Sequence, residues 1–344
     1  MTSTFKILLI LFVLFLAVLT IIGVYIPFYN RLSTPMGFNR NFESPEFLIK
    51  DTIPLGYTGY YFTGAHDNSI FLGHKSAPAH ILRYNLKTKD TIHLNFNIDR
   101  RQFPNLDPDK LKLAIQYPHT YFVDGSNGIF IKGNLINKNI NETNELEWRF
   151  DNYIQIDSNT IAFRTYDMDK QQNMLAVINS IGKASDIYHP KKQQDGIFDT
   201  DGRLFHKNND LIYLLYYRNE FLVFDNTLKL QYAGKTIDTI STAQIDISTL
   251  DNTLTISGPP LRVNKNLFIN HGKLYIESMI KSNNQSLKKF QQQVTIDVYD
   301  LKKGTYLHSF YFPKINRKRP VEYTIHKDKL MAIFDKNLVI FHGY

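Results

Sequence analysis

Short hydrophobic and aromatic runs alternate with polar turns along most of the chain. In six places a run of strand-forming residues is followed by a turn of two to five residues rich in Asn, Asp, Gly, His and Lys, and then by a second run. This pattern is the sequence signal of a β-hairpin. The six segments are YYFTGAHDNSIFLGH from residue 60, TYFVDGSNGIFIKG from 120, YIQIDSNTIAFRTY from 153, RLFHKNNDLIYLLYY from 203, LFINHGKLYIESM from 267 and EYTIHKDKLMAIF from 322.

Several hairpins are followed by a third alternating segment that turns at a polar corner into a fourth. Such pairs occupy residues 81–96, 174–189, 221–234 and 294–312. A four-stranded antiparallel unit repeated every 30 to 60 residues or so is typical of propeller blades. The second unit departs from the pattern, because the Asn-rich stretch NLINKNINETNE at 134–145 is expected to interrupt it.

The two ends of the folded region complement each other. The last unit supplies only three strands before the chain ends at Tyr344, whereas FLIKDTIPLG, from Phe47, has no hairpin partner. Pairing this segment with the C-terminal strands closes the ring and removes free strand edges. We therefore expect residues 46–344 to form an all-β, six-bladed β-propeller with ring closure between its N- and C-terminal strands. A β-sandwich with a similar number of strands is the alternative.

These hairpins, together with the corners NLKTKD, FDNTLK and DLKKGTY, resemble six-bladed β-propellers of the NHL/TolB-like type. The similarity is greatest to the membrane-anchored or secreted propellers common in envelope proteins of Bacteroidota, and it covers residues 47–344. The resemblance implies an exported propeller. It implies no substrate, because the shared features are architectural.

One uncharged segment stands apart from the strand pattern. Residues 7–28 form a run of 22 residues without a charge, long enough to cross a hydrocarbon core of about 30 Å. A cleaved signal peptide has a shorter apolar region and a small-x-small site, and a core helix has polar positions. The sequence therefore predicts a transmembrane α-helix that acts as a signal anchor within residues 1–31, followed by a polar tether at 32–45.

The orientation of this helix depends on few charges. Lys6 precedes the apolar run, while Arg31 and Arg40 follow it, so the positive charges are nearly balanced. A short basic tail before an apolar run has the order of an export signal. We expect a single-pass membrane protein with its C-terminal domain outside the cytoplasm, in a bacterial periplasm.

Composition excludes several classes of protein. Of the 344 residues, 43% are hydrophobic and 14% aromatic, which fits a folded, strand-rich domain. The absence of cysteine excludes disulfides, thiolate catalysis and Cys-ligated metals. The formal net charge of +8 is modest for a nucleic-acid-binding protein, and the sequence contains no nucleic-acid-binding motif.

The sequence assigns no catalytic residue, metal ligand or cofactor. The patterns GxSxG, GxGxxG and HExxH are absent. Closely spaced aspartates occur in three loops, but none completes a calcium loop, and they are expected to be solvated turns. The histidines are expected in turns and on strand surfaces.

Basic residues recur in alternate connections between blades. In a propeller, all connections from the outermost strand of one blade to the innermost strand of the next lie on one face. The predicted connections after blades one, three and five contain basic runs, and together they predict a basic rim that attracts anionic partners. Its residues are Arg100, Arg101, Lys191, Lys192, Arg317, Lys318 and Arg319.

These features favour a recognition or assembly module that binds an envelope protein or an anionic surface ligand. Propeller faces suit this role because variable loops are carried on a rigid ring. The alternative is a propeller enzyme, either a hydrolase or lactonase or a quinone-dependent dehydrogenase, with a metal or cofactor at the central channel.

Overall fold

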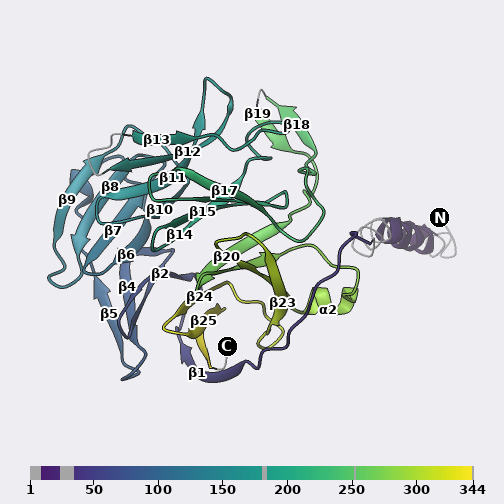
Figure 1. Cartoon of the computed structure of the whole chain (residues 1–344), viewed down its shortest axis with the longest axis horizontal. Helices are drawn as coiled ribbons and strands as arrows, with labels where there is room; N and C mark the ends of the chain where they lie inside the picture. Colours follow the sequence, from purple (N-terminus) through teal and green to yellow (C-terminus); the bar gives the residue numbers. More distant parts are fainter. Residues whose placement is uncertain (1–8, 24–34, 180–183, 252, 343–344) are drawn as a thin grey trace.

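The computed structural model describes residues 9–23, 35–179, 184–251 and 253–342 of the chain. Six four-stranded antiparallel sheets form the blades of a β-propeller (Figure 1). The first strands of the blades line a central cavity, so they are the innermost strands. The predicted all-β, six-bladed architecture is confirmed.

Five blades are built from consecutive strands. Blade one contains β2 (Tyr60–His66), β3 (Ser69–His74), β4 (Ala77–Asn85) and β5 (Thr91–Asn95), and blade two contains β6 (Lys112–Gln116), β7 (His119–Asp124), β8 (Ile129–Asn134) and β9 (Ile140–Glu145). Blade three contains β10 (Asn152–Gln155), β11 (Thr160–Asp167), β12 (Gln172–Asn179) and β13 (Ala184–Tyr188). Blade four contains β14 (Gly202–Lys207), β15 (Asp210–Leu215), β16 (Glu220–Phe224) and β17 (Leu230–Lys235), and blade five contains β20 (Asn264–Asn270), β21 (Lys273–Ser278), β22 (Val294–Asp300) and β23 (Tyr306–Phe312).

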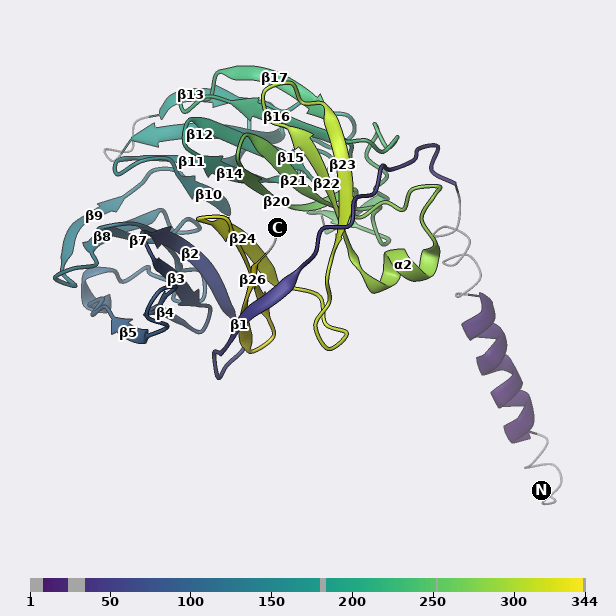
Figure 2. The same cartoon turned by 60° about the horizontal axis from the view of Figure 1, so that its bottom comes forward.

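Blade six joins the two ends of the domain. It contains β24 (Glu322–His326), β25 (Lys329–Phe334), β26 (Asn337–His342) and, as its outermost strand, β1 (Leu48–Pro54). Strand β1 is antiparallel to β26, with Leu48 opposite His342 and Pro54 opposite Asn337 (Figure 2). The predicted ring closure is therefore confirmed, and it pairs the free edge of β26.

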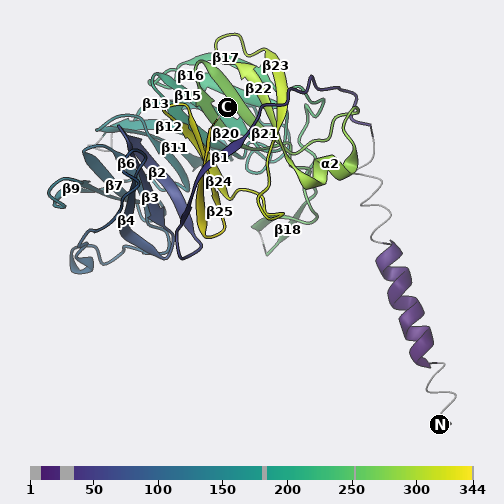
Figure 3. The same cartoon turned by 90° about the horizontal axis from the view of Figure 1, so that it is seen from below.

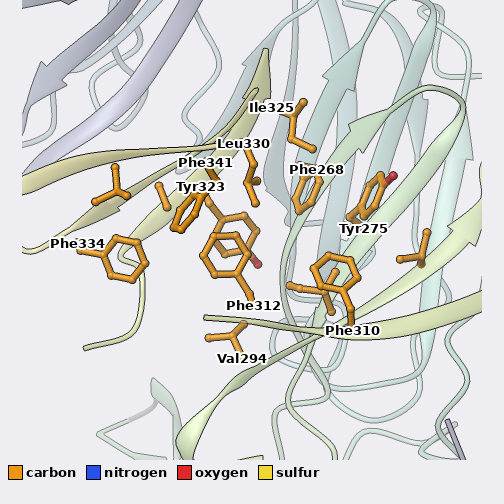
Figure 4. Close-up of a cluster of buried hydrophobic side chains, with 14 residues drawn as sticks. Phe268, Tyr275, Val294, Phe310, Phe312, Tyr323, Ile325, Leu330, Phe334 and Phe341 are labelled. Atoms are coloured by element: carbon orange, nitrogen blue, oxygen red, sulfur yellow. The ribbon is translucent and has the colours of Figure 1, made fainter. Parts of the chain in front are cut away.

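The core lies between neighbouring blades. Middle strands such as β15 are almost continuously buried, because both of their faces pack against side chains of other strands. Between blades five and six, 14 buried residues form one aromatic-rich cluster (Figure 4). Within it, the rings of Phe268 and Tyr275 stack at 4.5 Å, and Phe312 stacks on Tyr323 at 5.3 Å. Apolar surface buried on both sides of each blade holds the ring together.

Side chains also connect the blades at their inner edges. The backbone N–H of Leu113 donates to the Tyr61 hydroxyl at 3.0 Å, and the backbone N–H of Leu204 donates to Asn152 Oδ1 at 3.3 Å. Each bond joins the first strand of one blade to a side chain of the preceding blade. These bonds satisfy polar backbone groups at a strand edge that has no neighbouring strand.

The start of blade two differs from the sequence prediction. Its first strand is β6, and the segment from Thr120 forms the second and third strands, β7 and β8. The Asn-rich stretch at 134–145 does not interrupt the blade, because it supplies the β8–β9 turn and the outermost strand β9. Residues of β9 alternate between partly buried and exposed, as an outermost strand permits, so a polar sequence is tolerated there.

Three elements lie in connections and were not predicted. A hairpin of β18 (Ile247–Leu250) and β19 (Thr253–Ile256) is inserted between blades four and five. Helix α2 (Leu287–Gln292) lies between β21 and β22, and a 3-10 turn (Arg100–Gln102) lies between β5 and β6. The side chain of Ser286 caps α2 by accepting a hydrogen bond from the backbone N–H of Lys289.

The N-terminal region contains a helix at residues 9–23 whose side chains are exposed, and it stands away from the propeller (Figure 3). In the described parts of the chain, no helix combines the length and the apolar character needed to cross a membrane. The segment expected to span the membrane, 7–28, extends at both ends beyond the described helix.

The segment expected to be a tether lies against the propeller in its described part, from residue 35 onward. Phe38 is buried with Ile240, Val263 and Ile280. Phe42 stacks on Tyr311 of β23 at 4.5 Å between ring centroids. Residues 35–45 are therefore docked on blade five, and we refer to them as the docked segment.

Candidate basic face and central cavity

The predicted basic residues lie in the expected connections. Arg100 and Arg101 lie between β5 and β6, Lys191 and Lys192 between β13 and β14, and Arg317, Lys318 and Arg319 between β23 and β24. All three segments run from the last strand of one blade to the first strand of the next. These connections lie on the same face of the propeller as the turns between the second and third strands of each blade. We call this face the connector face.

Acidic residues offset the positive charge in two of these connections. Arg101 forms an ion pair with Asp99 at 2.9 Å. The connection that carries Lys191 and Lys192, whose side chains are exposed, also contains three aspartates, Asp195, Asp199 and Asp201. The basic rim stays a prediction.

Positive charge instead gathers beside blade five. Helix α2 and the β23–β24 connection together contain six basic residues, which we call the blade-five basic cluster: Lys288, Lys289, Lys314, Arg317, Lys318 and Arg319. The side chains of Lys314 and Arg319 both donate to the backbone carbonyl of Gln291, at 2.9 and 3.2 Å, which ties the connection to the helix.

Few acidic groups neutralise the cluster. Lys318 pairs with Asp335 at 2.5 Å, and Lys289 lies 4.4 Å above the ring of Tyr311. Partial burial, and then the charge of Arg319, lower the pKa of Lys314. Neither α2 nor the β23–β24 connection contains a carboxylate of its own. The cluster is therefore a patch of net positive charge on the connector face.

A buried ion pair holds the docked segment beside this cluster. Arg40 Nε lies 2.7 Å from Asp297 Oδ1, and its Nη2 lies 2.9 Å from Asp297 Oδ2; both side chains are almost fully buried. Arg40 also donates to the Ser278 hydroxyl at 2.8 Å and to the Ile280 carbonyl at 2.9 Å. A buried guanidinium without a partner would be costly, and the bidentate pair with Asp297 satisfies it. The pair therefore holds the docked segment against blade five.

The start of the docked segment lies on the connector face. The backbone N–H of Met36 donates to Asn283 Oδ1 at 2.9 Å, and its carbonyl accepts from the Thr239 hydroxyl at 2.6 Å. Asn283 lies in the β21–β22 connection and Thr239 in the connection after β17. The docked segment therefore begins at the same face that carries the basic cluster.

The second candidate site is a cavity of 680 Å³ in the central channel. Residues from all six blades line it, mostly from the beginnings of the innermost strands, which lie at the connector face. Its charged residues are Lys75, Lys112, Arg203, Arg262, Lys265, Asp109 and Glu322. Of these, only Asp109 was considered from the sequence, in an aspartate pair expected to form a solvated turn. The only available signal was a basic residue at or near the start of β6, β14 and β20.

Local contacts set the chemistry of the cavity. Glu322 lies 3.8 Å from Arg203, and its burial raises the pKa of the Glu322 carboxyl. Lys112 Nζ donates to the carbonyl of Asp151 at 2.8 Å, and burial lowers the pKa of Lys112. The guanidinium of Arg262 lies 4.0 Å from the ring centroid of Tyr216.

Two of the three aspartate pairs lie in tight turns, whereas the buried Asp199 of the third pair accepts backbone N–H groups of its own loop, including that of Gly196 at 2.7 Å. Asp107 Oδ1 accepts the backbone N–H of Asp109, and Asp167 Oδ1 accepts that of Asp169, each at 2.9 Å. These contacts are side-chain caps of tight turns. Within the described residues, no group of three His, Asp or Glu side chains is arranged to hold a metal ion.

Comparison with known proteins supports the fold. No family model matches the chain, and no curated protein matches it in sequence. A member of the DUF4221 family from Bacteroides vulgatus is 12% identical, with a TM-score of 0.53 over 88% of this chain and 98% of that one. A Bacteroides fragilis protein named as a candidate exported protein is 11% identical, with a TM-score of 0.53 over 90% of this chain and 100% of that one. At this identity the likeness concerns the fold, and the NHL/TolB-like type stays a prediction.

Proposed function

We propose that the protein is a membrane-anchored, extracytoplasmic recognition module that binds an acidic envelope partner through its connector face. The observation that carries the proposal is the blade-five basic cluster, where six basic side chains gather and Lys318 pairs with Asp335. A rigid ring that presents such a patch favours electrostatic recognition of a complementary surface.

Location outside the cytoplasm is supported by two observations. The uncharged run at 7–28 has the length of a signal anchor. One of the two similar structures belongs to a protein named as a candidate exported protein. The periplasmic side of a bacterial inner membrane fits both observations.

The docked segment supports a partner close to the membrane. Met36 enters the domain at the connector face, so an anchor N-terminal to it would hold this face near the bilayer. The Arg40–Asp297 pair fixes the entry point on blade five. An acidic envelope protein in the same membrane, or an anionic ligand at its surface, could then reach the basic cluster.

Co-purification tests the proposal. Full-length protein is isolated from its own membranes in mild detergent, and every co-eluting protein and small molecule is identified by mass spectrometry. We expect a stoichiometric acidic partner that is lost from the variant Arg317→Glu/Arg319→Glu and at raised salt. The matched control is Lys302→Glu/Lys303→Glu, two exposed lysines of the same blade in the β22–β23 turn on the opposite face.

The two variants carry the same change in net charge, so a difference in partner binding between them reflects where on the protein the charges lie. Retention of the partner by the Arg317/Arg319 variant would overturn the assignment of the face. Loss of the partner from both variants would mean that net charge, and not the cluster, governs binding.

An enzyme is the second candidate, and Glu322 favours it. A carboxyl with a raised pKa in a central cavity is a common feature of acid-base catalysts. A tightly held metal or organic cofactor in the purified protein, with no protein partner, would support this alternative.

A further inference from the structure

The central cavity has the features of a small-molecule site separate from the blade-five basic cluster. Its volume of 680 Å³ is in the range that accommodates small ligands. The cavity is bounded by the innermost strands of six different blades, so its walls are parts of the rigid ring. A ligand would enter from the connector face, where the lining residues begin their strands.

The lining has an excess of positive charge. Five basic residues face two acidic ones, a difference of three charges. Lys265 is already paired with Glu277 at 2.9 Å. The nearest carboxylate to Arg203 is Glu322, at the long distance of 3.8 Å. The charge of Arg203 is therefore only weakly compensated.

Arg262 is held in place without a carboxylate partner among the described residues. Its Nε donates to the carbonyl of Asn264 at 3.1 Å, and its guanidinium stacks over Tyr216. These contacts do not engage the two terminal nitrogens of Arg262. Such a pair of nitrogens can bind a carboxylate through two parallel hydrogen bonds. The charges of Arg203 and Arg262 both act on the Tyr216 hydroxyl and oppose the rise in its pKa caused by burial. Arg203 on β14 and Arg262, two residues before β20, come from adjacent blades whose first strands are in contact, so both arginines lie on the same side of the cavity.

The remaining walls suit a sugar ring. Tyr61, Tyr153 and Tyr216 are partly exposed and supply aromatic surface, while Asn152 and Asn266 supply amide groups for hydroxyls. We propose that the cavity binds an acidic saccharide of one or two residues, with its carboxylate on Arg203 and Arg262. This site does not depend on the protein partner proposed above.

Calorimetric titration of the full-length protein in mild detergent tests this inference, with digalacturonate as the probe and the neutral disaccharide galactobiose as its matched analogue. We expect digalacturonate to bind at least about tenfold more tightly than galactobiose, because only the acid engages the two arginines. The wild-type comparison needs no variant and so does not depend on how a mutant folds.

Variants then locate the site. Arg203→Gln/Arg262→Gln should weaken digalacturonate binding by about tenfold or more. Arg317→Gln/Arg319→Gln, in the basic cluster outside the cavity, should leave it unchanged. Absence of digalacturonate binding, equal binding of galactobiose, or full binding by a folded Arg203/Arg262 variant would each overturn the inference. None of these results bears on the acidic partner of the basic cluster.

Discussion

The carboxylate of Glu322 in blade six accepts a hydrogen bond from the backbone N–H of Phe62 in blade one at 2.9 Å. This contact joins the innermost strands β24 and β2 across the point where the ring closes. It complements the β1–β26 pairing at the outer edge of blade six. The ring is thus closed by a strand at its periphery and by a side chain at its centre.

Removing this acceptor is expected to weaken the closure. Glu322→Ala leaves the N–H of Phe62 unpaired and should lower the free energy of unfolding by about 1 to 3 kcal/mol. Glu322→Gln keeps an acceptor of the same shape and should be tolerated. Urea denaturation at pH 7 compares the two variants, and equal stability of the alanine variant and the wild type would show that the bond does not contribute.

The buried pair Arg40–Asp297 should contribute strongly to stability. Arg40→Met leaves the Asp297 carboxylate buried without its partner and should cost about 3 to 5 kcal/mol. The double variant Arg40→Met/Asp297→Leu should lose less than the sum of the single changes, because no charge is left unpaired. Limited proteolysis provides a second measurement, since release of the docked segment exposes residues 35–45 to cleavage. A free energy of unfolding of Arg40→Met within about 1 kcal/mol of the wild-type value would contradict a strong contribution from this pair.

Asp238 should make stability depend on pH. Burial raises the pKa of Asp238 from 3.8 to about 6, although it accepts hydrogen bonds from Thr236 Oγ1 and the backbone N–H of Ile240. Between about pH 4 and pH 6 the folded protein retains a proton that the unfolded chain has released, so this group's contribution to stability decreases as the pH rises through this window.

Removing the charge of the Asp238 carboxylate should remove this pH dependence of stability. Asp238→Asn should raise the free energy of unfolding by about 2 kcal/mol at pH 7 and by little at pH 4. Denaturation curves of both proteins at the two pH values measure the difference. A pH-independent difference would argue against a raised pKa of Asp238.

Gly64 allows strands β2 and β6 to approach closely. A Cβ atom at this position would lie 2.2 Å from the backbone oxygen of Ile115. Gly64→Ala should therefore force the first two blades apart and cost about 1 to 3 kcal/mol. Gly258→Ala is the control, because its Cβ would meet its nearest atom, an oxygen of Asp246, at 3.4 Å. Equal melting temperatures for the two variants would contradict the steric argument.

Local sequence patterns predicted most of the fold. Hairpin turns between alternating runs indicated most of the blade strands, and the unpaired segment from Phe47 indicated the closing strand β1. Strand β6 was missed because KLAIQ is short and follows a long connection. Strand β9 was missed because its sequence is polar. An outermost strand does not need a hydrophobic face, so such a strand gives no hydrophobic signal in the sequence. Helix α2 was missed because it is short and polar, and the β18–β19 hairpin was missed because each of its strands has only four residues.

A charged site could be predicted from the sequence only where its basic residues lie in a single connection between two blades. Arg317 to Arg319 are adjacent in sequence, and the blade assignment placed them on the connector face. The proximity of Arg40 to Asp297, which are 257 positions apart, depends on tertiary packing. The cavity likewise combines residues from six blades, so no local sequence pattern brings Arg203 and Arg262 together.

Site-specific photo-crosslinking in living cells tests the central claim, that the connector face binds an envelope partner. A benzophenone amino acid is placed at position 288, on α2 in the basic cluster, or at position 303, on the opposite face of the same blade; both side chains are exposed. We expect a discrete adduct with one envelope protein from position 288 and none from position 303. An adduct from position 303 alone, or from neither position, would contradict it.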